Sequence, residues 1–98
     1  MYRIVYEKQA VKDIPRLKAA KLDKKAQALI EILRNNPTQP PCEALVGNLS
    51  GLHSRRINIQ HRLVYEIIEE KIIQDEIEYQ GTVKIIRMWT HYDGLGSW

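Results

Sequence analysis

The chain has 98 residues, of which 44% are hydrophobic and 28% charged, a composition that fits one globular domain and excludes a disordered chain. No stretch approaches the roughly 20 apolar residues of a membrane span, and the opening MYRIVYEKQA lacks the apolar core of a secretion signal. With a single cysteine, Cys42, no internal disulfide can form. We therefore expect a cytoplasmic protein that does not associate with membranes.

Charge is distributed unevenly along the chain. The net charge is +3, yet residues 66–78 hold six of the twelve acidic residues and one basic residue. Outside that segment, fourteen basic residues stand against six acidic ones. A surface with this excess attracts polyanions, either nucleic acid or an acidic protein partner. The alternative is a dispersed charged surface that serves only solubility.

The N-terminal part of the chain predicts a strand followed by a helical region. Residues 2–6, YRIVY, alternate between β-branched and aromatic or charged types, as strands do. The helical region covers residues 8–21, and Pro15 inside it predicts a kink or the start of a second piece. The apolar residues that recur there at a spacing of three are Val11, Ile14 and Leu17.

A second helix is predicted after Asp23, whose side chain can act as its N-cap. The apolar residues of one helix face follow at the i, i+3, i+4 and i+7 spacing, as Ala26, Leu29, Ile30 and Leu33. This helix should end at the sequence NNP. There Asn35 or Asn36 can take the left-handed cap conformation, and Pro37 cannot continue a helix.

The second half of the chain predicts a loop and then a meander of strands. Residues 37–51 contain three prolines and two glycines and are expected to form an irregular loop. The segments SRRINIQ and RLVYEII alternate on either side of a tight turn near Gln60 and His61, which predicts a β-hairpin. KIIQDEIEYQG extends the meander as an acidic hairpin.

The last predicted strand is TVKIIRMWTHY. Alternation places its side chains on two faces, Val83, Ile85, Arg87, Trp89 and His91 on one and Ile86, Met88, Thr90 and Tyr92 on the other. The whole chain, residues 1–98, is thus predicted to be a single α+β domain of order β-α-α-β-β-β. Two N-terminal helices pack on one face of a mostly antiparallel, twisted sheet.

Arginines mark the face of this sheet that the helices leave open. Alternation puts Arg55 and Arg56 on opposite faces of their strand, so at least one of them reaches solvent, where Arg62 can join it. A guanidinium group offers a planar fork of donors that suits phosphate oxygens. Exposed arginines more often serve solubility, so this pattern alone does not define a site.

Five ordered elements carry a resemblance to a known family. EALVGNLSGLHSRRINIQHRLVY, residues 43–65, and the later His91-Tyr92 pair resemble the YoeB/Txe family of type II toxins, in the RelE/ParE superfamily. In that family a loop glutamate, an L-x-G-x-x-S-R-R-I strand, an H-R-L-V-Y strand and a terminal His-Tyr pair occur in this order. A strand and two helices precede them in matching order.

The resemblance implies a RelE-like fold and a ribosome-dependent messenger-RNA endonuclease that cleaves in the A site. The implied partners are a cognate antitoxin of the YefM/Phd kind, the 70S ribosome and its mRNA, and, by family analogy, a second copy of the chain. The family's catalytic residues fall on Glu43, Arg62, His91 and Tyr92. Its substrate-binding arginines fall on the SRRI motif, as Arg55 and Arg56.

The residue types suit RNA cleavage by the 2′-hydroxyl. This reaction needs a base for the hydroxyl proton, positive charge on the phosphate and an acid for the leaving 5′-oxygen. We assign Glu43 as base, His91 as acid and Tyr92 as a substrate-positioning or stacking group; the base and acid roles can be exchanged. Arg56 and Arg62 clamp the phosphate. The spacings of the three histidines and Cys42 fit no zinc site, so no metal or other cofactor is expected.

Departures from the family pattern leave two other classes of function open. Val46 stands where many members have a lysine, and His53 stands where an aromatic residue commonly precedes SRR. The acidic excursion 66–81 is longer than the usual connection, and DGLGSW, residues 93–98, extends beyond the His-Tyr pair. The alternatives are a toxin of the same fold with another target, such as DNA gyrase, and a noncatalytic module that binds RNA or protein.

Overall fold

The computed structural model describes residues 1–89, except for the side chain of Asn48. Within these residues, a five-stranded sheet has the order β1-β7-β4-β3-β2, and β5 and β6 form a separate two-stranded sheet. The strands are β1 (Tyr2–Tyr6), β2 (Glu43–Ala44), β3 (Leu52–Arg56), β4 (Arg62–Ile68), β5 (Ile72–Gln74), β6 (Ile77–Tyr79) and β7 (Gly81–Arg87). The helices are α1 (Lys8–Ala19), α2 (Asp23–Asn35) and a 3₁₀ turn at Gly47–Leu49.

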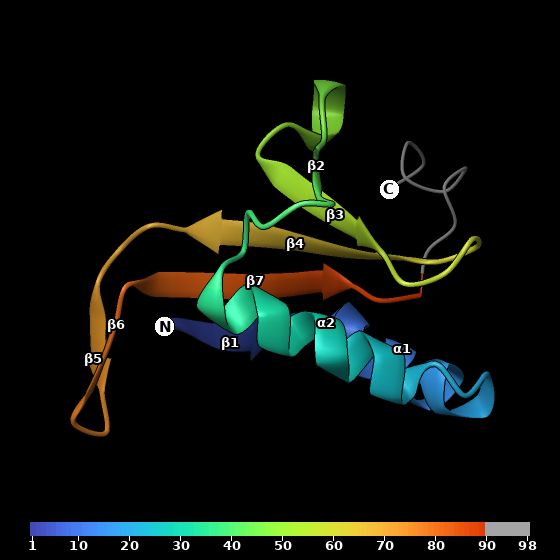
Figure 1. Cartoon of the computed structure of the whole chain (residues 1–98), viewed down its shortest axis with the longest axis horizontal. Helices are drawn as coiled ribbons and strands as arrows, with labels where there is room; N and C mark the ends of the chain where they lie inside the picture. Colours follow the sequence, from blue (N-terminus) through green and yellow to red (C-terminus); the bar gives the residue numbers. More distant parts are fainter. Residues whose placement is uncertain (90–98) are drawn as a thin grey trace.

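The sheet is antiparallel except at one edge, and both α-helices cover one of its faces (Figure 1). Strand β1 pairs in parallel with β7, whereas β7 with β4, β4 with β3 and β3 with β2 are antiparallel. Strand β7, near the end of the described chain, therefore lies beside the first strand. The predicted α+β class, with two N-terminal helices on a mostly antiparallel sheet, is confirmed.

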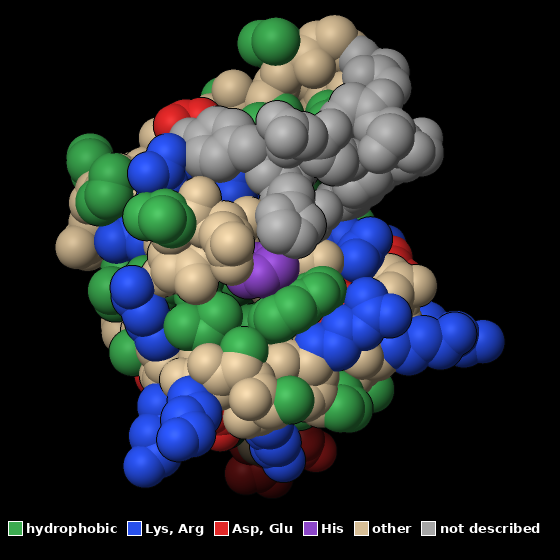
Figure 2. All heavy atoms as spheres, turned by 90° about the vertical axis from the view of Figure 1, so that its right-hand side faces the viewer, with side chains coloured by type: hydrophobic (Ala, Val, Ile, Leu, Met, Phe, Trp, Pro, Cys, Tyr) green, Lys and Arg blue, Asp and Glu red, His purple; other side chains and the backbone are tan. Residues whose placement is uncertain are grey.

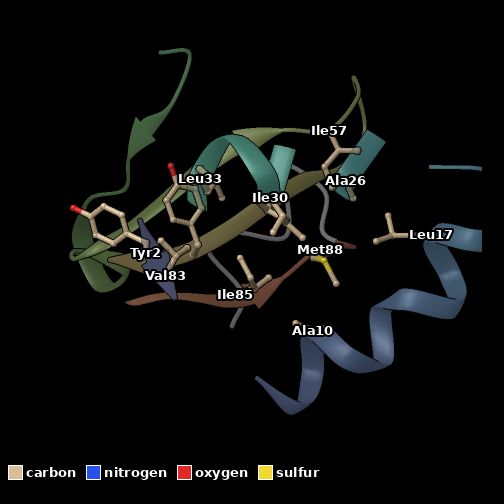
Figure 3. Packing of buried hydrophobic residues seen from close by; sticks show 12 residues of the cluster. Tyr2, Ala10, Leu17, Ala26, Ile30, Leu33, Ile57, Val83, Ile85 and Met88 are labelled. Carbon is tan, nitrogen blue, oxygen red and sulfur yellow. The ribbon is translucent and has the colours of Figure 1, made fainter. Parts of the chain in front are cut away.

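The core lies between the helices and the sheet, as Figure 3 shows. Alternation along β4 and β7 directs every second side chain toward the helices. The buried apolar side chains are Tyr2, Ala10, Leu17, Ala26, Ile30, Leu33, Ile57, Leu63, Tyr65, Val83, Ile85 and Met88. Each large apolar side chain that is fully buried contributes about 1.5–3 kcal/mol. The opposite face of the sheet carries no α-helix within residues 1–89.

The first helix differs from its prediction in which residues it buries. Helix α1 continues through Pro15 as one element, so the expected second piece is not found between Lys8 and Ala19. Val11 is 51% exposed, and the buried side chains are Ala10, Asp13 and Leu17. Of the expected apolar residues, Leu17 is buried and Ile14 packs against the core, whereas Val11 faces solvent and the buried face includes the carboxylate of Asp13.

The second helix ends at the NNP sequence and buries its apolar face as predicted, but both predicted caps were wrong. Leu22 occupies the N-cap position and Asp23 is the first helical residue, where its negative charge favours the positive end of the helix dipole. Asn36 is extended, with φ −152°, and not left-handed. Its Oδ1 instead accepts hydrogen bonds from the backbone N–H and the hydroxyl of Thr38. A side-chain turn therefore replaces the expected cap.

The β3–β4 connection is wider than the predicted tight turn. Strand β3 ends at Arg56 and β4 begins opposite it at Arg62. The intervening residues 57–61 fold around Asn58, whose Oδ1 accepts from the backbone N–H groups of Gln60 at 2.9 Å and His61 at 2.7 Å. The predicted irregular loop, in turn, contains the short strand β2, which completes the sheet edge.

The last strand is shorter than predicted, and its alternation stops early. Strand β7 ends at Arg87, and Met88 is 2% exposed in the same core as Val83 and Ile85. The expectation that Met88 faces the other side was wrong, because strand alternation no longer applies beyond the strand. The predictions for Thr90, His91 and Tyr92 and for the extension 93–98 lie outside the described residues.

The acidic hairpin is confirmed as β5 and β6, which project from the body of the protein (Figure 1). Its turn places Asp75 at φ 52° and Glu76 at φ 66°, a left-handed pair of the type I′ kind. Between residues 1 and 89, no helix has both the length and the apolar character needed to cross a membrane.

Candidate active site

Two strand pairings, β2 with β3 and β3 with β4, bring Glu43 and Arg62 together. Glu43 on β2 lies opposite Ser54 on β3, and Arg56, two residues further along β3, lies opposite Arg62 on β4. Residues two apart on a strand face the same side, so these side chains share one face of the sheet. The Arg62 Nη2 atom lies 3.2 Å from Glu43 Oε1. Glu43 and Arg62 thus form an ion pair although they are 19 positions apart in the sequence.

The ion pair borders a cavity of about 260 Å³ on the face of the sheet opposite the helices. Its lining comes from the end of the loop and from the two central arginines, as Pro41, Cys42, Glu43, Arg56 and Arg62. The Arg62 side chain is only 3% exposed, whereas that of Glu43 is 59% exposed. A buried guanidinium interacts more strongly with an anion than a solvated one, because little water screens it. The cavity can hold one phosphate group between the two arginines, beside a carboxylate.

Arg55 points the other way and does not join this group. Its strand partner is Leu63, a core residue beneath the helices, and its own side chain is 6% exposed. Arg55 Nη1 donates a hydrogen bond of 2.7 Å to the Gln39 carbonyl oxygen. The structure therefore separates Arg55 from Arg56, Arg62 and Glu43, and Arg55 holds the loop that leads to Glu43.

Tyr65 holds the same loop from the neighbouring strand. Its hydroxyl donates a buried hydrogen bond of 2.7 Å to the Pro37 carbonyl oxygen. Burial raises the pKa of the Tyr65 hydroxyl well above its ordinary value, so the group stays a neutral donor. Loop residues 37–42 are thus attached at two carbonyl groups to the sheet that carries Arg62. These attachments hold the segment that leads into Glu43, the first residue of β2.

Two histidines near the site make ring contacts. The His53 ring stacks on Tyr65 with centroids 5.7 Å apart, so the imidazole provides a stacking contact where the family commonly has an aromatic residue. The buried His61 ring stacks on Trp89 at 3.8 Å. In the part of the chain that the structure describes, no three His, Cys, Asp or Glu residues are grouped as metal ligands would be. The candidate residues His91 and Tyr92 lie outside the described residues.

The sequence reading missed one buried charged residue, Asp13. Its side chain is 0% exposed in the middle of α1, and its Oδ2 atom accepts hydrogen bonds from Arg87, Met88 and Trp89 at the end of β7. The sequence signal for its burial was its position on the apolar face of helix α1. Asp13 lies three residues after Ala10 and four before Leu17, on the apolar face of the helix.

The charge of the surface is segregated in space as well as in sequence. Figure 2 shows the end of the molecule that faces away from the acidic hairpin, and blue Lys and Arg side chains gather around it. Few acidic side chains are visible on this face. A polyanion that approaches the protein is attracted to this end and repelled by the opposite one.

Comparisons with known proteins agree with this architecture. A family profile described as the YoeB-like toxin of bacterial type II toxin-antitoxin systems matches residues 6–92. Toxin YoeB of Synechocystis sp. is 42% identical over 55 residues, an alignment that covers 54% of this chain and 64% of that protein.

Two solved structures have the same fold. The YoeB/ParE toxin from Agrobacterium tumefaciens superposes with a TM-score of 0.76 at 23% identity, over 92% of this chain and 99% of that one. YoeB from Staphylococcus aureus, solved as a dimer, superposes with a TM-score of 0.68 at 30% identity, over 93% of this chain and 98% of that one. The same S. aureus protein has also been solved in a YoeB-YefM complex. The family profile matches most of the chain, and the fold is the one seen in the S. aureus relative. The chain therefore belongs to the YoeB-like toxins of bacterial type II toxin-antitoxin systems.

Proposed function

We propose that this toxin is a ribosome-dependent endoribonuclease that cuts mRNA in the A site of the 70S ribosome. One observation carries the proposal: a solvent-exposed carboxylate, Glu43, lies 3.2 Å from the buried guanidinium of Arg62, at a cavity that Arg56 also lines. This combination provides a proton acceptor beside two positive charges. Transfer of the 2′-hydroxyl proton and stabilisation of a phosphorane both need such a pair.

In this mechanism the phosphate enters the cavity and takes the place of Glu43 as the partner of Arg62. Glu43, released from the ion pair, accepts the proton of the 2′-hydroxyl, and the hydroxyl oxygen attacks the adjacent phosphorus. Arg56 and Arg62 stabilise the negative charge that develops on the phosphoryl oxygens. His91 protonates the departing 5′-oxygen and Tyr92 positions the substrate; the base and acid roles of Glu43 and His91 can be exchanged. All three functions come from side chains, so the proposed reaction needs no metal or cofactor.

The toxin is proposed to act in the cytoplasm and to be neutralised by a cognate antitoxin of the YefM/Phd kind. The S. aureus relative, whose structures include a YoeB-YefM complex and a dimer, supports an antitoxin partner and self-association. An acidic antitoxin segment would compete with RNA for the basic end of the molecule. Such binding should weaken with added salt to the extent that charge drives it.

In vitro translation of a defined message, followed by primer extension, tests the proposal. The wild type should produce discrete breaks in the coding sequence only when ribosomes translate it, and Glu43→Ala should not. Glu31→Ala is a matched control, because Glu31 is also an exposed glutamate paired with an arginine, Arg34, but lies on α2. A message with a 2′-deoxynucleotide at the mapped position should resist cleavage.

The same experiment can contradict the mechanism. Breaks that persist at a 2′-deoxy position, with a 3′-phosphate formed without a cyclic precursor, would rule out attack by the 2′-hydroxyl. Growth arrest that survives substitution of both Glu43 and His91 would favour a toxin that blocks another target or only binds RNA or protein.

A further inference from the structure

We propose that Asp13 is a positioning residue for the active site. Its buried carboxylate fixes the direction in which the chain leaves β7, and it holds Trp89 against His61, the residue that directly precedes Arg62. The inference rests on the proposed function. It adds a residue on α1, outside the segments that carry the family's motifs.

One carboxylate oxygen organises the end of the strand. Asp13 Oδ2 accepts from Arg87 Nε at 3.1 Å and from the backbone N–H groups of Met88 at 2.9 Å and Trp89 at 3.2 Å. The last two residues follow the end of β7 and have no strand pairing to use their N–H groups. Buried backbone donors without a partner are costly, and Asp13 supplies the acceptor that the sheet does not.

Arg87 closes this arrangement from the other side. Its Nη2 atom donates to the Trp89 carbonyl oxygen at 2.9 Å while its Nε atom binds Asp13. Trp89 is therefore held at its N–H by Asp13, at its carbonyl by Arg87 and at its indole ring by the stack on His61. Three separate contacts leave this residue little freedom to change the chain direction.

The position of Trp89 connects this anchor to the chemistry. Trp89 precedes His91 by two residues, and its stacking partner His61 directly precedes Arg62. The anchor thus ties the chain that leads into His91 and Tyr92 to the strand that carries the phosphate-binding arginine. A displacement of a catalytic group by about 1 Å can lower the rate about 100-fold.

Burial of the carboxylate argues that its role is more than packing. A fully buried charge is destabilising unless it is paired, and apolar residues of similar size often give equal or greater stability. Asp13 lies on the face that Ala10 and Leu17 bury, where an apolar residue would fit the core pattern. An apolar residue cannot accept two consecutive backbone N–H groups, so only a polar acceptor can impose this chain direction.

Hydrogen exchange of the full-length toxin tests the anchor without reference to activity. In Asp13→Ala the amides of Met88 and Trp89 should exchange at least about tenfold faster than in the wild type, because their acceptor is gone. Asp13→Asn retains an acceptor oxygen and should recover part of the protection. Glu31→Gln, which removes a carboxylate from a surface ion pair on α2, should leave both amides unchanged.

Cleavage kinetics on programmed ribosomes test the positioning role. We expect kcat to fall about 100-fold in Asp13→Ala with KM changed less than threefold, and Asp13→Asn to lie between this variant and the wild type. If Asp13→Ala does not fold, Arg87→Gln serves instead, since it removes the guanidinium bonds to Asp13 and to the Trp89 carbonyl and leaves the two backbone bonds to Asp13. Arg87→Gln should also lower kcat more than KM.

The outcomes separate the two proposals. Wild-type protein that cuts no message overturns the nuclease function, and the positioning role falls with it. Active wild type with full kcat in a folded Asp13→Asn and a folded Arg87→Gln, despite faster exchange of the two amides, overturns the positioning role alone. Unchanged exchange in Asp13→Ala overturns the anchor itself.

Discussion

The Glu43 carboxylate and the Arg62 guanidinium lie 3.2 Å apart, and their side chains are 59% and 3% exposed respectively. The arginine is held in place by the sheet, while the glutamate stands in solvent at the end of a loop. Glu43 can therefore turn into solvent when another anion takes its place, whereas the buried Arg62 side chain has little room to move. This asymmetry suits a site in which a phosphate displaces the carboxylate and the carboxylate then accepts a proton.

Glu43→Gln should separate activity from stability. We expect cleavage to be lost, because an amide cannot accept the hydroxyl proton. The free energy of unfolding should change by less than about 1 kcal/mol, because the Glu43 side chain is largely in solvent and the glutamine oxygen can still accept a hydrogen bond from Arg62. Urea unfolding and primer extension on the same preparation measure both quantities. Unfolding that shifts by several kcal/mol would contradict the description of Glu43 as a loosely held partner.

Arg62→Lys should abolish cleavage while the protein remains folded. The ammonium group retains the charge but presents no planar fork to two phosphate oxygens. Arg34→Lys, on the exposed surface of α2, is the matched control and should keep full activity. Circular dichroism checks the fold of both variants, and primer extension checks cleavage. Wild-type cleavage by Arg62→Lys would show that geometry at this arginine is unimportant.

Tyr65→Phe should weaken both the fold and the site. The change removes the donor to the buried Pro37 carbonyl oxygen, and a buried acceptor left without its partner costs about 1–3 kcal/mol. The loop that leads to Glu43 loses one of its two attachments, so kcat should fall as well. Urea unfolding at neutral pH and cleavage kinetics test this. Tyr6→Phe, at a residue that is 43% exposed, should change neither quantity measurably.

Stability should decline at alkaline pH, and the sign follows from two tyrosines. Burial raises the pKa of Tyr65, and burial followed by the hydrogen bonds to Glu69 raises that of Tyr2. The folded state therefore favours the neutral phenols. Their contribution is complete below the unfolded pKa of about 10 and is lost as the pH rises further. Unfolding by urea between pH 8 and 11 should show the decline, and it should be smaller when both residues are changed to Phe. A flat profile above pH 10 would contradict the assignment.

The turn of the acidic hairpin offers a stabilising substitution. Asp75 and Glu76 are both left-handed, a conformation that costs most residues roughly 1–2 kcal/mol. Glu76→Gly should slow exchange of the β5 and β6 amides by a few-fold because glycine adopts positive φ freely. Glu78→Gly, inside β6, is the control and should accelerate exchange. Acceleration by Glu76→Gly would show that the turn conformation is wrong.

Much of the fold could be predicted because local patterns and packing agree. Alternation in YRIVY and RLVYEII identified strands, and it correctly assigned Arg55 and Arg56 to opposite faces. The apolar spacing of Ala26, Ile30 and Leu33 identified the buried face of α2. In each case one face of the element is buried, and burial imposes the period that the sequence displays.

The predictions that were wrong concern places where a specific side-chain contact overrides the general preference of the sequence pattern. Asn36 could have capped α2 in the left-handed conformation, but its side chain forms a turn with Thr38. Met88 was assigned by alternation to the wrong face because β7 ends one residue earlier. At that end the Met88 N–H bonds to Asp13, which is far away in sequence. No local pattern around Met88 reports such a contact.

The candidate site was predicted by resemblance, and the structure bears on part of it. It places Glu43, Arg56 and Arg62 around one cavity and separates Arg55 from them. The roles of these residues, and those of His91 and Tyr92, remain predictions. Arg55 and Arg56 are the same residue type, so the sequence does not show which of them faces the helices. The pairing of Arg55 with Leu63 gives its face, and its hydrogen bond to Gln39 shows that it contacts the loop.

The position of β7 in the sheet has a consequence for how the toxin is made. Strand β1 is synthesised before every other strand of the described sheet, but its one neighbour there is β7, the last of these strands along the chain. An unfinished chain lacks the strand that joins β1 to β4, so its sheet stays split however long translation pauses. Folding must then wait for contacts between distant ends of the chain, which are slow to form. The described sheet is therefore complete only once β7 has been synthesised and has paired with both β1 and β4.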